Sequence, residues 1–128
     1  MILTLHRLDG AYAVARLAPG EGWPHWATWS RGLASITRTA TETSVVCEQL
    51  AVPGEVRAER DFVAYVVAGP LAFSSVGILA RLTTALAEAG VPVLAISTYD
   101  TDVILLRAAV QAVAESAWHA AGINIRDS

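Results

Sequence analysis

The sequence predicts an α+β fold built from two similar halves that pack as one compact unit. A weak internal repeat is the first observation, because residues 35–42 (SITRTATE) can be laid over residues 95–102 (AISTYDTD). Each copy has a cluster of Thr, Asp and Glu flanked by β-branched residues, which predicts strand, polar turn and strand. The second observation is the helical spacing of Val76, Leu79, Leu82 and Leu86, just ahead of the second copy.

The first half is predicted to contain two opening strands, a short helix and a hairpin. The opening strands, at residues 2–8 and 11–17, are separated by Asp9-Gly10, a dipeptide that favours a hairpin turn. A short helix over residues 24–30 follows, and then the hairpin of residues 35–46.

The second half is predicted to run strand, helix, strand, strand, helix and short strand. The expected elements are strands at 62–68 and 93–97, the hairpin return to 106, helices at 74–89 and 108–121, and a closing strand at 123–125. Ser74 or Ser75 can cap the first helix, while Gly90 and Gly122 can end the two helices in the left-handed conformation. This order is the split βαβ, or ferredoxin-like, arrangement, and the first half is a degraded version of it.

Composition excludes several classes of protein. The chain has 128 residues, of which 54% are hydrophobic and 16% charged, so it can bury a sizeable core. A net charge of −3 argues against nucleic-acid binding, and the apolar run 62–69 is far shorter than the roughly 18 residues that a membrane-spanning helix needs. The single Cys47 cannot form an internal disulfide, and the start MILTLHRLDG lacks the pattern of a secretory signal, so we expect a cytoplasmic protein.

Two stretches of the second half resemble small bacterial tandem ACT-domain proteins. They are Gly69 to Ala80 (GPLAFSSVGILA) and Ile96 to Asp102 (ISTYDTD), and the first half agrees through Ser35 to Thr39 leading to Ser44 to Cys47. Those proteins are similar to the ACT pairs of CASTOR-type arginine sensors and of aspartokinases. The resemblance implies an N-terminal ACT-like half at residues 1–60, a C-terminal ACT domain at 61–128, and the binding of an amino acid or another small metabolite without chemistry.

The residues themselves also support a ligand site in the second half. A glycine just inside a helix start, Gly77, lets a carboxylate approach unpaired backbone N–H groups at the positive end of the helix dipole. Side chains at the end of the next strand can accept hydrogen bonds from an ammonium group. The predicted ligand-binding residues are therefore Ser74, Ser75, Val76, Gly77 and Ile78 on one wall, and Ile96, Ser97, Thr98, Tyr99, Asp100 and Asp102 on the other.

The same residues also fit a structural explanation, in which a serine caps the helix, Gly77 packs against the sheet and the aspartates make the turn. Trp23, Trp26 and Trp29 recur every third residue, so they can form a stacking wall for a ligand, although a core or oligomer interface is the commoner role. Cys47 alternates with Val45 in a strand, which predicts a buried, unreactive thiol.

The sequence thus predicts a non-catalytic sensor that binds an amino acid. We expect no metal, because His6, His25 and His119 are scattered singly, no cofactor and no catalytic residue. Open sheet edges and the high hydrophobic content favour a homo-oligomer. The alternative is a protein–protein interaction module in which the pocket no longer binds a ligand.

Overall fold

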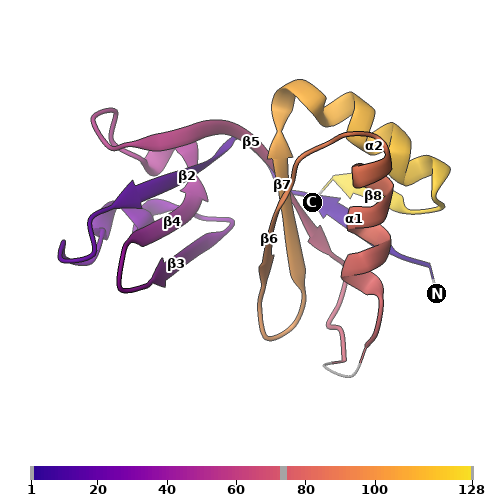
Figure 1. Ribbon diagram of the computed structural model, residues 1–128, viewed down its shortest axis with the longest axis horizontal. Helices are drawn as coiled ribbons and strands as arrows, with labels where there is room; N and C mark the ends of the chain where they lie inside the picture. Colours follow the sequence, from indigo (N-terminus) through magenta and orange to yellow (C-terminus); the bar gives the residue numbers. More distant parts are fainter. Residues whose placement is uncertain (1, 73–74, 128) are drawn as a thin grey trace. The chain divides into compact units, whose positions relative to one another are not determined.

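Two compact units make up the chain in the computed structural model, which describes residues 2–72 and 75–127 (Figure 1). Residues 10–62 form one of them, here called the N-terminal unit. Residues 1–9 and 63–128 form the other, the C-terminal unit. Residues 1–9 therefore belong with the second half of the chain, whereas the sequence predicted them in the first.

The C-terminal unit is a sheet covered on one face by two helices. Its elements are β1 (Thr4–Arg7), residues 63–67 of β5 (Ala58–Val67), α1 (Ile78–Glu88), β6 (Leu94–Ser97), β7 (Asp102–Arg107), η3 (Ala108–Val110), α2 (Gln111–Ala120) and β8 (Asn124–Asp127). The strand order is β6-β7-β5-β1-β8, in which β1 runs antiparallel to β5 and parallel to β8. The predicted order of elements after β5 is confirmed, and β1 is an additional strand placed between β5 and β8.

The core of this unit explains why its helices form where they do. Ile78, Leu82 and Leu86 recur every fourth residue along α1 and are buried against the sheet. On α2, Trp118 is fully buried, packs its ring edge-on against Tyr65 with centroids 4.8 Å apart, and donates a 3.0 Å hydrogen bond from Nε1 to the Leu82 carbonyl. These contacts fix both helices on one face of the sheet.

Glycines end both helices as predicted. Gly90 and Gly122 have φ of 73° and 81°, in the left-handed region that favours glycine. After α1, the Gly90 and Val91 N–H groups donate to the Ala87 and Leu86 carbonyls, which closes the last turn. The start of α1 differs from the prediction, because the helix begins at Ile78 with Gly77 as its N-cap and no side-chain cap, so Ser75 does not cap it. Ser74 lies outside the described residues.

The hairpin predicted at Asp9-Gly10 is wrong. Strand β1 pairs with residues 65–67 of β5, whereas β2 (Tyr12–Leu17) pairs with residues 58–62 of β5 and with β4 (Thr43–Glu48). Gly10 does adopt the positive φ of 78° that the dipeptide favours, but the chain does not fold back there to pair β1 with β2. Burial of Leu3 and Leu5 in the core of the C-terminal unit accounts for the partner that β1 takes.

A half-buried polar cluster also holds β1 in the C-terminal unit. Arg7 donates from Nε and Nη2 to the two carboxylate oxygens of Glu115 on α2, over 3.0 and 2.6 Å, and it also pairs with Asp127 on β8. The Tyr65 hydroxyl and Gln111 Nε2 donate to Glu115 Oε2 over 2.6 and 3.0 Å. One carboxylate therefore joins β1, β5 and α2.

The N-terminal unit repeats the order of four of these strands and has no counterpart of β8 and no α-helix among its described residues. Its elements are β2, η1 (His25–Trp29), β3 (Ala34–Arg38), β4, η2 (Gln49–Ala51) and residues 58–62 of β5, with strand order β3-β4-β2-β5. Short 3₁₀ turns stand where the C-terminal unit has helices, so this half is degraded as predicted. Its small core contains Ala13, Ala15, Ala27, Val45, Cys47, Ala51 and Val52.

Candidate ligand site

A pocket of about 350 Å³ opens in the C-terminal unit between the start of α1 and the turn that joins β6 to β7. Its lining residues are Leu71, Ala72, Ser75, Gly77, Ile78, Leu79, Ala80, Ser97, Thr98, Tyr99, Asp100, Thr101 and Asp102. The two stretches that the sequence singled out thus form opposite walls of one pocket.

Gly77, the N-cap of α1, leaves the helix wall of the pocket open. Its φ of 81° is one that L side chains rarely adopt, and a Cβ built on it would meet no other atom within 4 Å. The backbone N–H groups that follow Gly77 have no partner within the helix, because they belong to its first turn. This end of α1 therefore offers hydrogen-bond donors and a partial positive charge beside open space.

The facing wall is a tight turn with a polar surface. The turn closes through the Thr98 N–H, which donates to the Thr101 carbonyl over 2.8 Å, and through the Thr101 N–H, which donates to Thr98 Oγ1 over 3.1 Å. At its base, Ser97 Oγ donates to Asp102 Oδ1 over 2.6 Å. This bond orients the Asp102 carboxylate, whose other oxygen can accept from a ligand.

The turn is tied to the segment that leads into α1, so the two walls keep a fixed spacing. Thr101 Oγ1 donates to the Val67 carbonyl over 2.6 Å, and the Leu71 N–H donates to the Asp100 carbonyl over 2.7 Å. A Cβ at Gly69 would lie 2.9 Å from the Leu71 nitrogen and 3.3 Å from the Asp100 carbonyl oxygen, so this close approach requires glycine.

The predicted site residues are mostly, but not all, brought together. Those that line the pocket are Ser75, Gly77, Ile78, Ser97, Thr98, Tyr99, Asp100 and Asp102. Val76 is 91% exposed and Ile96 is half-buried, and neither lines it. Ser74 lies outside the described residues. The pocket has five further lining residues that were not among the predicted ones: Leu71, Ala72, Leu79, Ala80 and Thr101. Leu79 and Ala80 follow Ile78 directly in the predicted helix, which is the sequence signal that points to them.

Trp26 and Cys47 have a structural role in the N-terminal unit, whereas two tryptophans are exposed. Trp26 packs against the core of the N-terminal unit, whereas Trp23 and Trp29 are 56% and 73% exposed. Cys47 is fully buried as predicted, and burial, with a smaller effect of Glu48, raises the pKa of its thiol to about 11. Such a thiol is a poor nucleophile at neutral pH.

The described residues form neither a metal site nor a membrane-spanning helix. No group of three or more His, Cys, Asp or Glu side chains that could hold a metal ion occurs among residues 2–72 and 75–127. Within the same residues, neither helix has the length and apolar composition needed to cross a membrane.

Comparison with known proteins supports the fold and gives the family. The family model of the ACT domain matches residues 57–119, and a second model, of an N-terminal domain, matches residues 10–55. A solved structure of an Agobacterium tumefaciens protein is 31% identical, with a TM-score of 0.92 over 100% of this chain and 95% of that one. No curated protein matches the chain.

Two more distant structures share the fold. A Vibrio cholerae protein of unknown function is 16% identical, with a TM-score of 0.74 over 94% of this chain and 90% of that one. The regulatory subunit of aspartate kinase from Thermus thermophilus is 17% identical, with a TM-score of 0.59 over 94% of this chain and 97% of that one. The ACT model matches the residues that line the pocket, and the Agobacterium tumefaciens protein aligns with the whole of this chain. This chain therefore belongs to the family of small ACT-domain proteins.

Proposed function

We propose that this protein is a regulatory ACT-type sensor that binds a free amino acid in the pocket between α1 and the β6–β7 turn and catalyses no reaction. The observation that carries the proposal is the uncapped start of α1 at Gly77, which faces the oriented carboxylate of Asp102 across one pocket. The two walls have the opposite polarity that a zwitterion needs.

The ligand's carboxylate is proposed to lie against the backbone N–H groups of the first turn of α1. A helix start offers donors and a partial positive charge to an anion, and the missing Cβ of Gly77 leaves room for close approach. The ammonium is proposed to donate to Asp102 and to the oxygens of Ser97 and Thr98, because a bond to an ionised acceptor is about twice as strong as a neutral one.

The ligand's side chain is proposed to contact the apolar part of the lining. Leu71, Ala72, Leu79 and Ala80 supply this surface near the helix wall. Because apolar lining with few polar groups is typical of small-molecule sites, the pocket favours an amino acid with an aliphatic side chain. The name of the Thermus thermophilus neighbour, a regulatory subunit, supports a regulatory role for the fold.

The first experiment is a thermal-shift screen of the protein against the twenty amino acids. A ligand present at about 100 times its dissociation constant stabilises a fold by about 2.7 kcal/mol, which for a chain of this size raises the melting temperature by roughly 10 °C. Failure of all twenty to raise it at millimolar concentration would refute amino-acid binding.

The chain offers a matched pair of variants for locating the site. Gly77 and Gly122 both have φ of 81°, and a Cβ on either meets no atom within 4 Å, but only Gly77 lines the pocket. Gly77→Val and Gly122→Val should therefore lose similar stability through backbone strain. Only Gly77→Val should abolish the ligand-induced shift, and Asp102→Asn should weaken it. A shift that survives Gly77→Val in folded protein places the site elsewhere.

A second candidate function is a protein–protein interaction module. It is favoured by exposed apolar side chains in the N-terminal unit, since Trp23, Trp29 and Leu50 are 56%, 73% and 102% exposed. Tryptophan is enriched among residues that dominate binding energy at interfaces. If no ligand is found and Trp29→Ala abolishes capture of a purified partner protein, this function replaces the first. Under either, we propose a cytoplasmic homo-oligomer with no nucleic-acid or membrane partner.

A further inference from the structure

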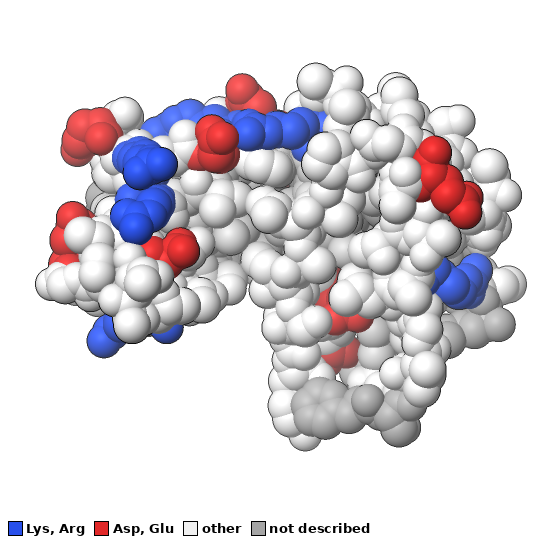
Figure 2. All heavy atoms as spheres, viewed as in Figure 1, with Lys and Arg blue, Asp and Glu red and all other residues white. Residues whose placement is uncertain are grey.

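Side chains of both charge signs line one pocket of the N-terminal unit. Figure 2 shows arginine and acidic side chains side by side on this unit. The pocket, here called the arginine pocket, has a volume of about 340 Å³ and is lined by Val14, Ala15, Arg16, Glu42, Ser44, Arg57, Ala58 and Glu59. All of these residues belong to the N-terminal unit, so the arginine pocket is separate from the candidate ligand site.

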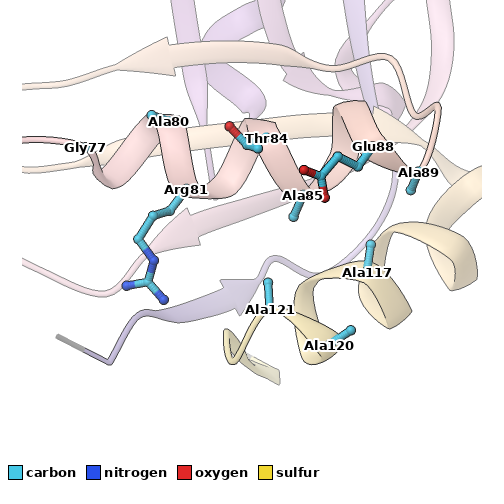
Figure 3. A pocket seen from close by; sticks show the side chains of 10 residues that line it. All are labelled: Gly77, Ala80, Arg81, Thr84, Ala85, Glu88, Ala89, Ala117, Ala120 and Ala121. Atoms are coloured by element: carbon cyan, nitrogen blue, oxygen red, sulfur yellow. The ribbon is translucent and has the colours of Figure 1, made fainter.

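The groove between α1 and α2 has a different character (Figure 3). Its volume is larger, about 650 Å³, but alanines supply most of its lining. An alanine side chain neither donates nor accepts a hydrogen bond, so most of this lining does not specify the chemistry of an occupant. The arginine pocket does specify it, because ionised groups and a hydroxyl group line it together.

Arg16 and Arg57 lie directly opposite each other on one face of the sheet. In the register of β2 with β5, Ala15 pairs with Ala58. The next residues along these antiparallel strands are Arg16 and Arg57, and the Arg16 N–H donates to the Arg57 carbonyl over 2.9 Å. Ala15 and Ala58 pack at the core of the unit, and successive residues of a strand point to opposite faces. Both arginine side chains therefore lie on the face away from that core.

A hydroxyl group extends this row of side chains onto a third strand. Ser44 of β4 pairs with Arg16 of β2. Val45 follows Ser44 and is buried in the core, so the Ser44 side chain lies on the same face as the two arginines. Directly opposite residues of neighbouring strands have Cβ atoms about 4.5–5.5 Å apart. Two guanidinium groups and one hydroxyl can therefore reach a single small group.

The two guanidinium groups have no carboxylate partner among residues 2–72 and 75–127. Arg16 Nη2 donates to the Thr41 carbonyl over 3.1 Å, and within those ranges neither Arg16 nor Arg57 forms an ion pair. Like charges directly opposite each other in a sheet are destabilising. A bound anion would offset this repulsion and would accept charge-assisted hydrogen bonds from both side chains.

We propose that the arginine pocket binds a small phosphate monoester that carries hydroxyl groups, such as a sugar phosphate. A phosphate monoester has three acceptor oxygens and a charge close to −2 at neutral pH, which suits two guanidinium groups and a hydroxyl better than a carboxylate does. The Glu42 carboxylate lines the same pocket and can accept hydrogen bonds from the sugar hydroxyl groups. The pocket volume of about 340 Å³ is within the range of small-molecule sites.

Ser44→Asp tests the convergence of the two arginines without any ligand. The introduced carboxylate takes the position of the phosphate and pairs with both guanidinium groups. The matched control is Ser44→Asn, because Asp and Asn are both disfavoured in strands and only Asp is charged. Ser44→Asp should melt at a higher temperature than Ser44→Asn, and the difference should vanish when Arg16 and Arg57 are both replaced by Gln. If Ser44→Asp melts no higher than Ser44→Asn, the arginines do not converge there and the proposal is overturned.

Isothermal titration calorimetry with ribose 5-phosphate measures the binding itself, and inorganic phosphate and ribose are the partial probes. Ribose 5-phosphate should bind at least about tenfold more tightly than inorganic phosphate, and ribose should not bind at about 10 mM. Equal affinity for ribose 5-phosphate and inorganic phosphate would overturn the role given to the hydroxyl groups. No binding of ribose 5-phosphate at about 10 mM would overturn the proposal as a whole.

Arginine variants locate the bound phosphate. Arg16→Gln and Arg57→Gln should each weaken ribose 5-phosphate binding by roughly tenfold or more, because each removes charge-assisted hydrogen bonds. The matched control is Arg38→Gln, at an exposed arginine of β3 that does not line the pocket, and it should change the dissociation constant by less than about twofold. A loss on Arg38→Gln as large as on Arg16→Gln indicates non-specific attraction of an anion and contradicts the proposal.

Two more variants separate this site from the amino-acid site. Ser44→Asp should abolish ribose 5-phosphate binding, because its carboxylate occupies the position of the phosphate. Gly77→Val should leave that binding unchanged, since Gly77 lies in the other unit. If Gly77→Val abolishes it in folded protein, the probe binds at the start of α1 and the arginine pocket is not its site. Circular dichroism checks that every variant is folded, and a failure of amino acids to bind leaves these results unaffected.

Discussion

Removing the charge of Glu115 should destabilise the protein in a way that depends on pH. The side chains of Glu115 and Arg7 are 17% and 27% exposed, and the carboxylate accepts hydrogen bonds from Arg7, Tyr65 and Gln111. Burial by itself would raise the pKa of Glu115, but these hydrogen bonds outweigh it and lower the pKa from 4.5 to about 2. Glu115→Gln keeps the shape of the side chain and removes only the charge.

The size and sign of the effect follow from that pKa. A carboxyl group whose pKa is depressed by about 2.5 in the folded state contributes about 3 kcal/mol of stability at neutral pH, at 1.36 kcal/mol for each pH unit. The contribution is fully present above pH 4.5 and is lost as the pH falls through about 2, because the unfolded chain binds the proton first. Glu115→Gln should therefore cost about 2–3 kcal/mol at pH 7 and much less near pH 2.

Urea denaturation followed by circular dichroism at several pH values measures this difference. The control is Glu55→Gln, which removes an exposed carboxylate from the N-terminal unit and should leave the pH profile unchanged. If Glu115→Gln costs the same at pH 7 and near pH 2, or costs less than about 0.5 kcal/mol at pH 7, the carboxylate does not hold β1, β5 and α2 together as inferred.

Three further changes have definite expected outcomes. Cys47→Ser should lower stability by about 1–2 kcal/mol, because it buries a hydroxyl among alanines and valines. It should leave any ligand-induced shift in the melting temperature intact. In the unaltered protein, the Cys47 thiol should react with a thiol reagent only in denaturant. Trp118→Phe leaves the Leu82 carbonyl without its side-chain donor and should cost about 1–3 kcal/mol in urea denaturation, and a cost near zero would contradict the observed bond. Gly90→Ala, at φ of 73°, should lower stability by about 1 kcal/mol, whereas Gly54→Ala, where φ is not positive, should not.

The order of elements could be predicted from sequence because its signals are local. Apolar residues at helical spacing mark α1, glycines mark the ends of both helices, and Thr-rich turns mark the two hairpins. The partner of β1 could not be predicted in this way. Asp9-Gly10 supplies the backbone conformation of a tight turn, but Leu3 and Leu5 are buried by pairing with β5 and β8, which lie about 60 and 120 residues away in the chain.

Single residues of the candidate site could likewise be predicted only where a local sequence signal marks their position. Gly77 and Asp102 could be predicted because each lies at the end of a recognisable element. Ile96 does not line the pocket, because successive residues of a strand point to opposite faces and Ser97 already faces the pocket. Leu71 lines the pocket through its hydrogen bond to Asp100, 29 residues further along the chain, and such a distant contact has no local signal in the sequence.

The difference between the two units explains why the proposed ligand site occurs in only one of them. Four strands follow the same order in both units, but the segment after β2 is interrupted by Pro19, Gly20, Gly22 and Pro24, and only the five-residue η1 forms there. So short a turn has no aligned row of peptide dipoles behind its first N–H groups, whereas α1 has eleven residues behind Gly77. The carboxylate of the proposed ligand thus has donors in the C-terminal unit that the N-terminal unit does not build. The same loss of helices leaves Trp29 of η1 and Leu50 of η2 exposed, and these are the side chains on which the alternative proposal, an interaction module, rests.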